Sequence, residues 1–147
     1  MSQFVIDEQL PFDRVVFPIR RWASVKRIDE LRPAEVIKDD RIGTLLQQIK
    51  QPTFITIDGG FWSRRYCHPE YCILYFALRD DQHAEIPVLL RKCCQMDLLK
   101  TKRARMGKVV KIGRSRIEYL ERALLHQKCY PLFSNNHLLT IHVSTPP

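Results

Sequence analysis

Residues 53–62 read TFITIDGGFW, and this stretch sets the expectations for the rest of the chain. TFITI combines β-branched and aromatic residues, which predicts a buried β-strand. The strand ends on Asp58, and Gly59 and Gly60 then allow a sharp turn of the backbone. Aspartate is common in turns, so a turn alone accounts for Asp58. A carboxylate at the end of a buried strand is also what a metal or phosphate site needs.

Strand-like and helix-like segments alternate along the sequence. The expected strands are 3–10, 23–28, 53–57, 71–78 and 108–112, and the expected helices are 11–22, 39–50, 81–99 and 115–127. Residues 29–38 are expected to be a loop, and 136–143 either a further strand or a tail.

The strand YCILYFAL (71–78) is apolar throughout, which is typical of a strand covered on both faces. Together with the alternation, it predicts one α/β domain over residues 1–147, with a C-terminal helix and tail over 117–147. We expect a three-layer α/β/α sandwich with a mainly parallel sheet of about five strands and a central order of 2-1-3-4-5.

Composition bounds the class of protein. The chain has 147 residues, the size of one domain, and 24 Lys+Arg against 16 Asp+Glu give a net charge of +8. This balance favours a polyanionic partner, with nucleic acid first, although a merely basic protein has the same balance. No apolar stretch approaches the ~20 residues of a membrane span, and the N-terminus lacks the basic start of a signal peptide. With five irregularly spaced cysteines, these features predict a cytoplasmic protein with reduced thiols and no membrane partner.

Acidic residues stand at equivalent places in the predicted elements. Asp7 and Asp58 end the first and third strands, and Asp39 and Asp40 begin the helix before the third strand. The carboxyl ends of parallel strands meet at one edge of a sheet, so we expect these acids to converge. Converging carboxylates repel one another and need a cation, and oxygen ligands suit Mg²⁺ or Mn²⁺. Taken singly, each acid also fits a helix start or a turn.

At these residues the sequence resembles the PIN-like ribonuclease superfamily, in particular a compact group related to VapC-type toxins. DEQLP (7–11) stands where that group has DENLP, and KDDRI (38–42) where it has SDEEI. ITIDGGF (55–61) stands where it has VTxDxDF, and FALR (76–79) matches a strand ending in apolar-Leu-Arg. The resemblance covers residues 4–116, about three quarters of the chain.

The resemblance implies an α/β/α sandwich and RNA cleavage that depends on Mg²⁺ or Mn²⁺. It implies that Asp7, Asp39 and Asp58 are the catalytic acids and metal ligands, with Asp40 as a further ligand. It leads us to expect RNA as the substrate and an antitoxin protein as a partner. A homodimer is a further partner that we consider. Gly60 departs from the group, which has its second Asp at this position. The loss of that carboxylate could weaken the site, leave one metal instead of two, or mark an inactive member.

A basic strip, KTKRARMGKVVKIGRSR (100–116), carries eight Lys/Arg and no acid. Such a strip attracts phosphates without reading bases, although it could equally be the solvated face around an edge strand. Arg64 and Arg65 are expected near the acidic edge, with Phe61, Trp62 and Tyr66 beside them as stacking or core residues. The predicted nucleic-acid-binding residues are Arg64, Arg65, Lys100, Lys102, Arg103, Arg105, Lys108, Arg114 and Arg116.

Three functions remain open on the sequence. The first is a metal-dependent endoribonuclease, the toxin of a toxin–antitoxin pair. The second is a non-catalytic module on the same fold that binds nucleic acid or a partner. The three retained acids favour the first, and Gly60 favours the second. The third is a receiver-like phosphotransfer domain, which Asp58 fits only loosely and against which the excess positive charge argues.

Overall fold

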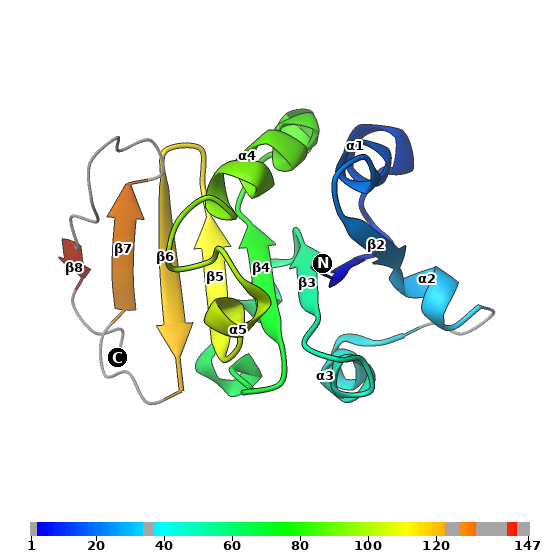
Figure 1. Ribbon diagram of the computed structural model, residues 1–147, viewed down its shortest axis with the longest axis horizontal. Helices are drawn as coiled ribbons and strands as arrows, with labels where there is room; N and C mark the ends of the chain where they lie inside the picture. The colour runs from blue at the N-terminus through cyan, green and yellow to red at the C-terminus, as the bar shows by residue number, and fades with distance from the viewer. Residues whose placement is uncertain (1–2, 34–36, 123–126, 132–140, 144–147) are drawn as a thin grey trace.

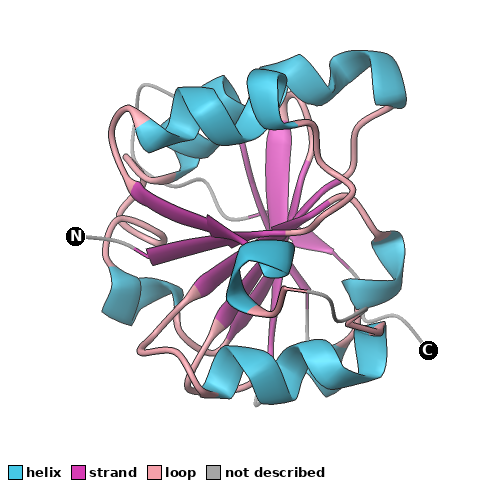
Figure 2. Cartoon of the chain, turned by 90° about the vertical axis from the view of Figure 1, so that its right-hand side faces the viewer, coloured by secondary structure: helices cyan, strands magenta, loops and turns pink. Residues whose placement is uncertain are grey.

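A computed structural model describes residues 3–33, 37–122, 127–131 and 141–143. These residues form an eight-stranded sheet in the order β2-β1-β3-β4-β5-β6-β7-β8, with helices on both faces (Figure 2). The strands are β1 (Gln3–Ile6), β2 (Ser24–Arg27), β3 (Thr53–Thr56), β4 (Cys72–Phe76), β5 (Lys108–Ile112), β6 (Arg116–Glu121), β7 (Gln127–Pro131) and β8 (Ile141–Val143). The predicted α/β class and the central order 2-1-3-4-5 are therefore confirmed.

The sheet is mixed rather than mainly parallel over its whole width. Strands β1 to β5 pair in parallel, whereas β6, β7 and β8 are added antiparallel. Figure 1 shows this reversal, since the arrow of β6 points opposite to that of β5. The five predicted strands are the parallel half of a wider sheet.

The predicted helix over 115–127 is wrong, because this region contains β6 and the start of β7. Ile117 and Leu120 are three residues apart, which is compatible with a helix, but Glu118 and Tyr119 between them are buried as well. Burial of four successive residues does not fit a one-sided surface helix. Gly113 N–H donates to Arg116 O at 3.0 Å and closes a tight turn, so that β6 pairs back onto β5.

Helical segments connect the parallel strands. They are η1 (Phe12–Val16, π-helical), α1 (Phe17–Arg20), α2 (Ile28–Leu31), α3 (Asp39–Gln47), η2 (Gly59–Phe61, 3₁₀), η3 (Arg64–Tyr66, 3₁₀), η4 (Asp80–Glu85, 3₁₀), α4 (Ile86–Cys93) and α5 (Lys102–Arg105). Pro18 and Pro87 each stand in the first turn of a helix, where a missing N–H leaves no hydrogen bond unmade. The predicted helices 11–22 and 81–99 are therefore each divided into two differently wound pieces, and α2 lies in part of the predicted loop 29–38.

The sheet separates two apolar cores because successive side chains of a strand point to opposite faces. One face is covered by η1, α1 and α4, and we call it the α4 face. The other is covered by α2, α3, η2 and η3, and we call it the α3 face. In the described part of the chain, none of the helices is long and apolar enough to cross a membrane. Of the predicted segment 136–143, only β8 lies within the described residues.

Candidate functional site

The α3 face changes from apolar to polar along one line across the sheet. Five paired residues form a buried apolar row, namely Val5, Phe54, Ile73, Val109 and Leu120. Two residues further toward the carboxyl edge of the parallel strands, the same strands carry Asp7, Thr56, Tyr75, Lys111 and Glu118. We call this second set the polar row. It is where the hydrophobic core ends and a polar site can begin.

Thr56 holds two of the predicted acids in place. Its side chain is fully buried, and its Oγ1 donates a hydrogen bond to Asp7 Oδ2 at 2.8 Å. The same oxygen accepts the backbone N–H of Asp58 at 3.0 Å. The first and third strands are thereby linked through one hydroxyl at the point where both acids leave the sheet.

The turn after Asp58 is organised around the carboxylate itself. Asp58 Oδ1 accepts the backbone N–H of Gly60 at 2.8 Å, which caps the short helix η2. A Cβ atom at Gly60 would lie 3.1 Å from Asp58 Oδ1, closer than an ordinary van der Waals contact. Glycine at position 60 therefore leaves the Asp58 carboxylate uncrowded.

The surroundings of Asp7 and Asp39 shift the pKa values of both carboxyls. The pKa of Asp7 is raised, chiefly by burial and further by the charges of Glu8 and Asp58, while hydrogen bonds from Thr56 and the backbone of Gln9 oppose the rise. The pKa of Asp39 is also raised. Asp39 is an exposed residue, but the largest cause is the partial removal of water from its carboxyl. A hydrogen bond with the Asp58 carboxyl and the negative charges of Asp58, Asp7 and Asp40 add to the rise.

The two pKa shifts thus support the predicted convergence of Asp7, Asp39 and Asp58, which belong to three separate parts of the fold. Asp39 is the first residue of α3, and Lys38 occupies the N-cap position, so neither Asp39 nor Asp40 is the cap. Asp40 is exposed, and its negative charge is one of the causes that raise the pKa of Asp39. Within the described residues, no group of three or more His, Cys, Asp or Glu side chains is arranged so that it could hold a metal ion.

The basic strip is divided by β5 into two parts at opposite edges of the sheet. Lys100, Lys102 and Arg103 precede β5 and lie at the amino edge, away from the acids. Lys108 at the start of β5 is 3.3 Å from Glu121, its ion-pair partner on β6. Most of the strip therefore does not flank the acidic site.

Arg105 was predicted to bind nucleic acid, and this prediction is wrong. Its side chain is fully buried, with Nε donating to Thr53 Oγ1 at 2.8 Å and Nη1 donating to Leu99 O at 2.9 Å. Its guanidinium also lies 5.3 Å from the centre of the Phe4 ring. A cation enclosed in this way stabilises the core and cannot meet a phosphate at the surface.

Arg64 and Arg65 belong to η3 on the α3 face, and Arg64 lies near Cys67. Arg65 is exposed and stacks on Tyr66, with 4.7 Å between its guanidinium carbon and the ring centre. Arg64 is half-buried, and its Nε and Nη2 have no hydrogen-bond partner among the described residues. Phe61 is buried against Phe54, which confirms that it is a core residue.

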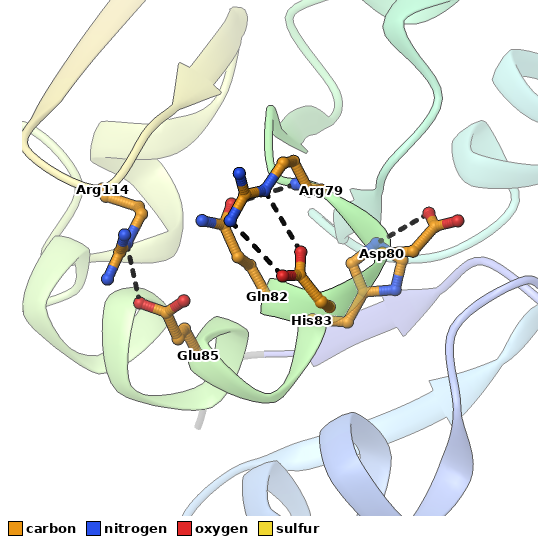
Figure 3. Close-up of polar contacts among 7 residues, drawn as sticks. Arg79, Asp80, Gln82, His83, Glu85 and Arg114 are labelled. Atoms are coloured by element: carbon orange, nitrogen blue, oxygen red, sulfur yellow. Dashed lines mark hydrogen bonds and ion pairs between the residues drawn. The ribbon is translucent and has the colours of Figure 1, made fainter.

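The carboxyl end of β4 carries a separate polar network (Figure 3). Arg79 pairs with Asp81 at 3.2 Å, and His83 Nε2 lies 3.8 Å from Asp80 Oδ1. Arg114 bridges from the β5–β6 turn to Glu85 at 3.0 Å. Since the first and last of these pairs are largely exposed, they contribute little to stability. Arg114 is held at this network, while Arg116 lies 3.6 Å from Glu118 of the polar row.

Sequence reasoning missed Thr56 and Tyr75 and placed Lys111 only within the general strip. A signal was present, because each stands two residues beyond a core position of a predicted strand. The strand period of two would have put them on the face that carries Asp7. No protein-family model matches the chain, and neither does any curated protein or solved structure.

Proposed function

We propose that the protein is a metal-dependent endoribonuclease whose active centre is formed by Asp7, Asp39 and Asp58. The observation that carries the proposal is the effect of the Asp58 charge on the other two acids, together with the Thr56 hydroxyl that links Asp7 to the Asp58 backbone. The pKa values of Asp7 and Asp39 are raised, and the charge of Asp58 contributes to both shifts. These shifts support the proposal that β1, β3 and α3 bring like charges together at one sheet edge.

A divalent cation fits the chemistry of these donors. Carboxylate oxygens are hard ligands that Mg²⁺ and Mn²⁺ prefer, and a cation would relieve the carboxylate repulsion that adds to the effect of burial on the two pKa values. Asp7, Asp39 and Asp58 would hold the ion by moving closer around it, because within the described residues their carboxylates do not already form a group of metal ligands. Asp40 follows Asp39 directly in the chain. When bound, such an ion lowers the pKa of coordinated water and polarises a phosphoryl oxygen.

The chain's own residues would orient the site. The Thr56 hydroxyl fixes the Asp7 carboxylate, and the Gly60 N–H fixes one oxygen of Asp58. The Asp58 carboxyl also shares a hydrogen bond with the Asp39 carboxyl, and a bound cation would replace that contact. Gly59 and Gly60 are both exposed, and their lack of side chains lets a substrate backbone approach this turn.

The net charge of +8 supports an RNA substrate, because it favours polyanions in general. The resemblance to the PIN-like ribonuclease superfamily supports the same substrate and a role as the toxin of a toxin–antitoxin pair. Induced expression tests that role. Growth arrest should follow expression of the wild type and should be absent with Asp58→Asn.

A non-catalytic module that binds nucleic acid or a partner is the second candidate. The observation in its favour is Gly60, which accommodates the Asp58 turn but supplies no carboxylate. In that case the acids would be remnants, and RNA would bind without being cut.

A cleavage assay separates the two candidates. Purified wild type, Asp58→Asn and Asp81→Asn are incubated with mixed single-stranded RNAs and Mn²⁺, with and without EDTA. Asp81 is an exposed acid on the separate β4 network, so its variant controls for loss of one charge. Cleavage by wild type and Asp81→Asn, abolished by EDTA and by Asp58→Asn, is expected. Binding without cleavage by the wild type would favour the non-catalytic module.

A further inference from the structure

We infer that Tyr75 and Lys111 extend the acidic site into a track that holds a backbone phosphate of single-stranded RNA next to the cleavage position. The inference rests on the proposed function, because it assigns substrate-binding residues to the same site. Neither residue belongs to the set that the sequence predicted for the site.

The sheet register places both residues in line with the acids. Tyr75 pairs with Thr56 on one side and with Lys111 on the other. Neighbouring strands are ~4.8 Å apart, so the Lys111 backbone lies about 10 Å from that of Thr56, which binds Asp7. All three side chains point to the α3 face, because they are two residues beyond buried core positions of that face.

Tyr75 offers a hydroxyl beside the Asp58 turn. A Cβ atom at Gly59 would lie 3.1 Å from the Tyr75 hydroxyl oxygen, so the turn passes directly over this group. The side chain is only half-buried. A substrate that approaches Asp58 along the turn would therefore meet a hydroxyl donor one strand away.

Lys111 supplies a cation on the same face. It is half-buried, and its Nζ lies 5.8 Å from the centre of the Trp62 ring. Within the described residues it takes part in none of the ion pairs, whereas Lys108 on the same strand is paired with Glu121. An ammonium group held against an aromatic ring keeps its charge available to a phosphate.

The position of Lys111 distinguishes it from the rest of the basic strip. Lys100, Lys102 and Arg103 lie at the opposite edge of the sheet, before β5 begins. They can add long-range attraction, but they cannot touch a phosphate that is bound beside Asp58. Lys111 is the cation of the strip that shares the polar row with Asp7.

The test is RNA binding in EDTA, where cleavage does not interfere. A fluorescein-labelled single-stranded RNA decamer is titrated with wild type, Lys111→Met and Lys100→Met, and the dissociation constant is read from anisotropy. Both variants remove one positive charge, and Lys100 is exposed at the far edge. We expect Lys111→Met to weaken binding about tenfold, because it removes a charge-assisted contact. Lys100→Met should change it by less than about twofold, because it removes only screened attraction.

Two further variants test whether a loss of affinity results only from misfolding. Lys111→Arg keeps the charge and should retain most of the affinity, and Tyr75→Phe keeps the ring and should weaken binding with no loss of thermal stability. Equal affinities of Lys111→Met and Lys100→Met, or no binding by the wild type, would overturn the inference. Binding that depends on Lys111 without any cleavage when Mn²⁺ is restored would uphold the inference and refute the nuclease. Cleavage by the wild type with unchanged affinity and KM in Lys111→Met would refute the inference alone.

Discussion

The buried hydroxyl of Thr56 donates a 2.8 Å hydrogen bond to Asp7 and so joins the third strand of the chain to the acid that ends the first. Thr56 also accepts the N–H of Asp58. One side chain therefore sets the relative position of the two acids, and the site depends on a residue that carries no charge.

Thr56→Val should destabilise the protein. Valine has nearly the same shape but leaves the Asp58 N–H without its acceptor and Asp7 without its donor, which costs about 1–3 kcal/mol. Urea unfolding at pH 7 measures the loss. Thr56→Ser keeps the hydroxyl and is the matched control, so equal stabilities of the valine and serine variants would contradict this role.

The raised pKa of Asp7 gives stability a specific pH dependence. In the folded state the Asp7 carboxyl keeps its proton to a higher pH than in the unfolded state, where its pKa is near 3.8. The stabilising contribution of this group is therefore fully present below that value and is lost as the pH rises through the folded pKa. Asp7→Asn should remove this dependence and gain stability relative to wild type at pH 7.

Urea unfolding of wild type and Asp7→Asn at several values between pH 4 and pH 7 checks this difference. Asp81→Asn serves as the control, because Asp81 is an exposed acid paired with Arg79. A stability difference between wild type and Asp7→Asn that stays constant over the whole range would contradict the pKa assignment.

Arg105→Met should be among the most destabilising changes of a cation in this chain. It leaves Thr53 Oγ1 and Leu99 O without the donors that now reach them, and we expect a loss of about 2–4 kcal/mol. The exposed Arg103→Met should change stability by less than about 0.5 kcal/mol. Chemical denaturation of both variants tests this contrast, and equal losses would show that Arg105 is not a core residue.

Gly60→Asp tests what the departure from the PIN-like pattern means. The new carboxylate would add an oxygen ligand beside Asp58, and Mn²⁺ affinity should rise by about tenfold. The crowding at 3.1 Å from Asp58 Oδ1 should cost some stability, which Gly60→Asn shares without adding charge. Calorimetric titration with Mn²⁺ compares the two variants. Equal affinities would show that position 60 does not face the cation.

The parallel half of the fold followed from local patterns. Buried strands such as TFITI ended in acids, and the alternation with helices fixed their arrangement. The antiparallel half did not follow, because Ile117 and Leu120 fit a helical spacing, and they fit a strand only when both of its faces are buried, as they are in β6. Only the pairing of β6 with β5 decides between them, and that contact is tertiary.

The acids of the site were predictable because strand ends in a parallel sheet share an edge. The RNA-binding surface was harder to predict from the sequence. Composition shows that residues 100–116 are basic, but it does not show that β5 divides them between two edges or that Arg105 enters the core. Tyr75 looked like an ordinary strand residue, and its place beside Asp58 depends on the turn at Gly59.

The central claim is that Asp7, Asp39 and Asp58 together bind a divalent cation. Its most direct test is a Mn²⁺ titration followed by electron paramagnetic resonance, which counts the free ion, on wild type, Asp58→Asn and Asp81→Asn. We predict saturable Mn²⁺ binding by wild type and Asp81→Asn that is lost in Asp58→Asn, with thermal unfolding showing that all three proteins are folded. Equal Mn²⁺ binding by all three, or none by the wild type, would contradict the claim.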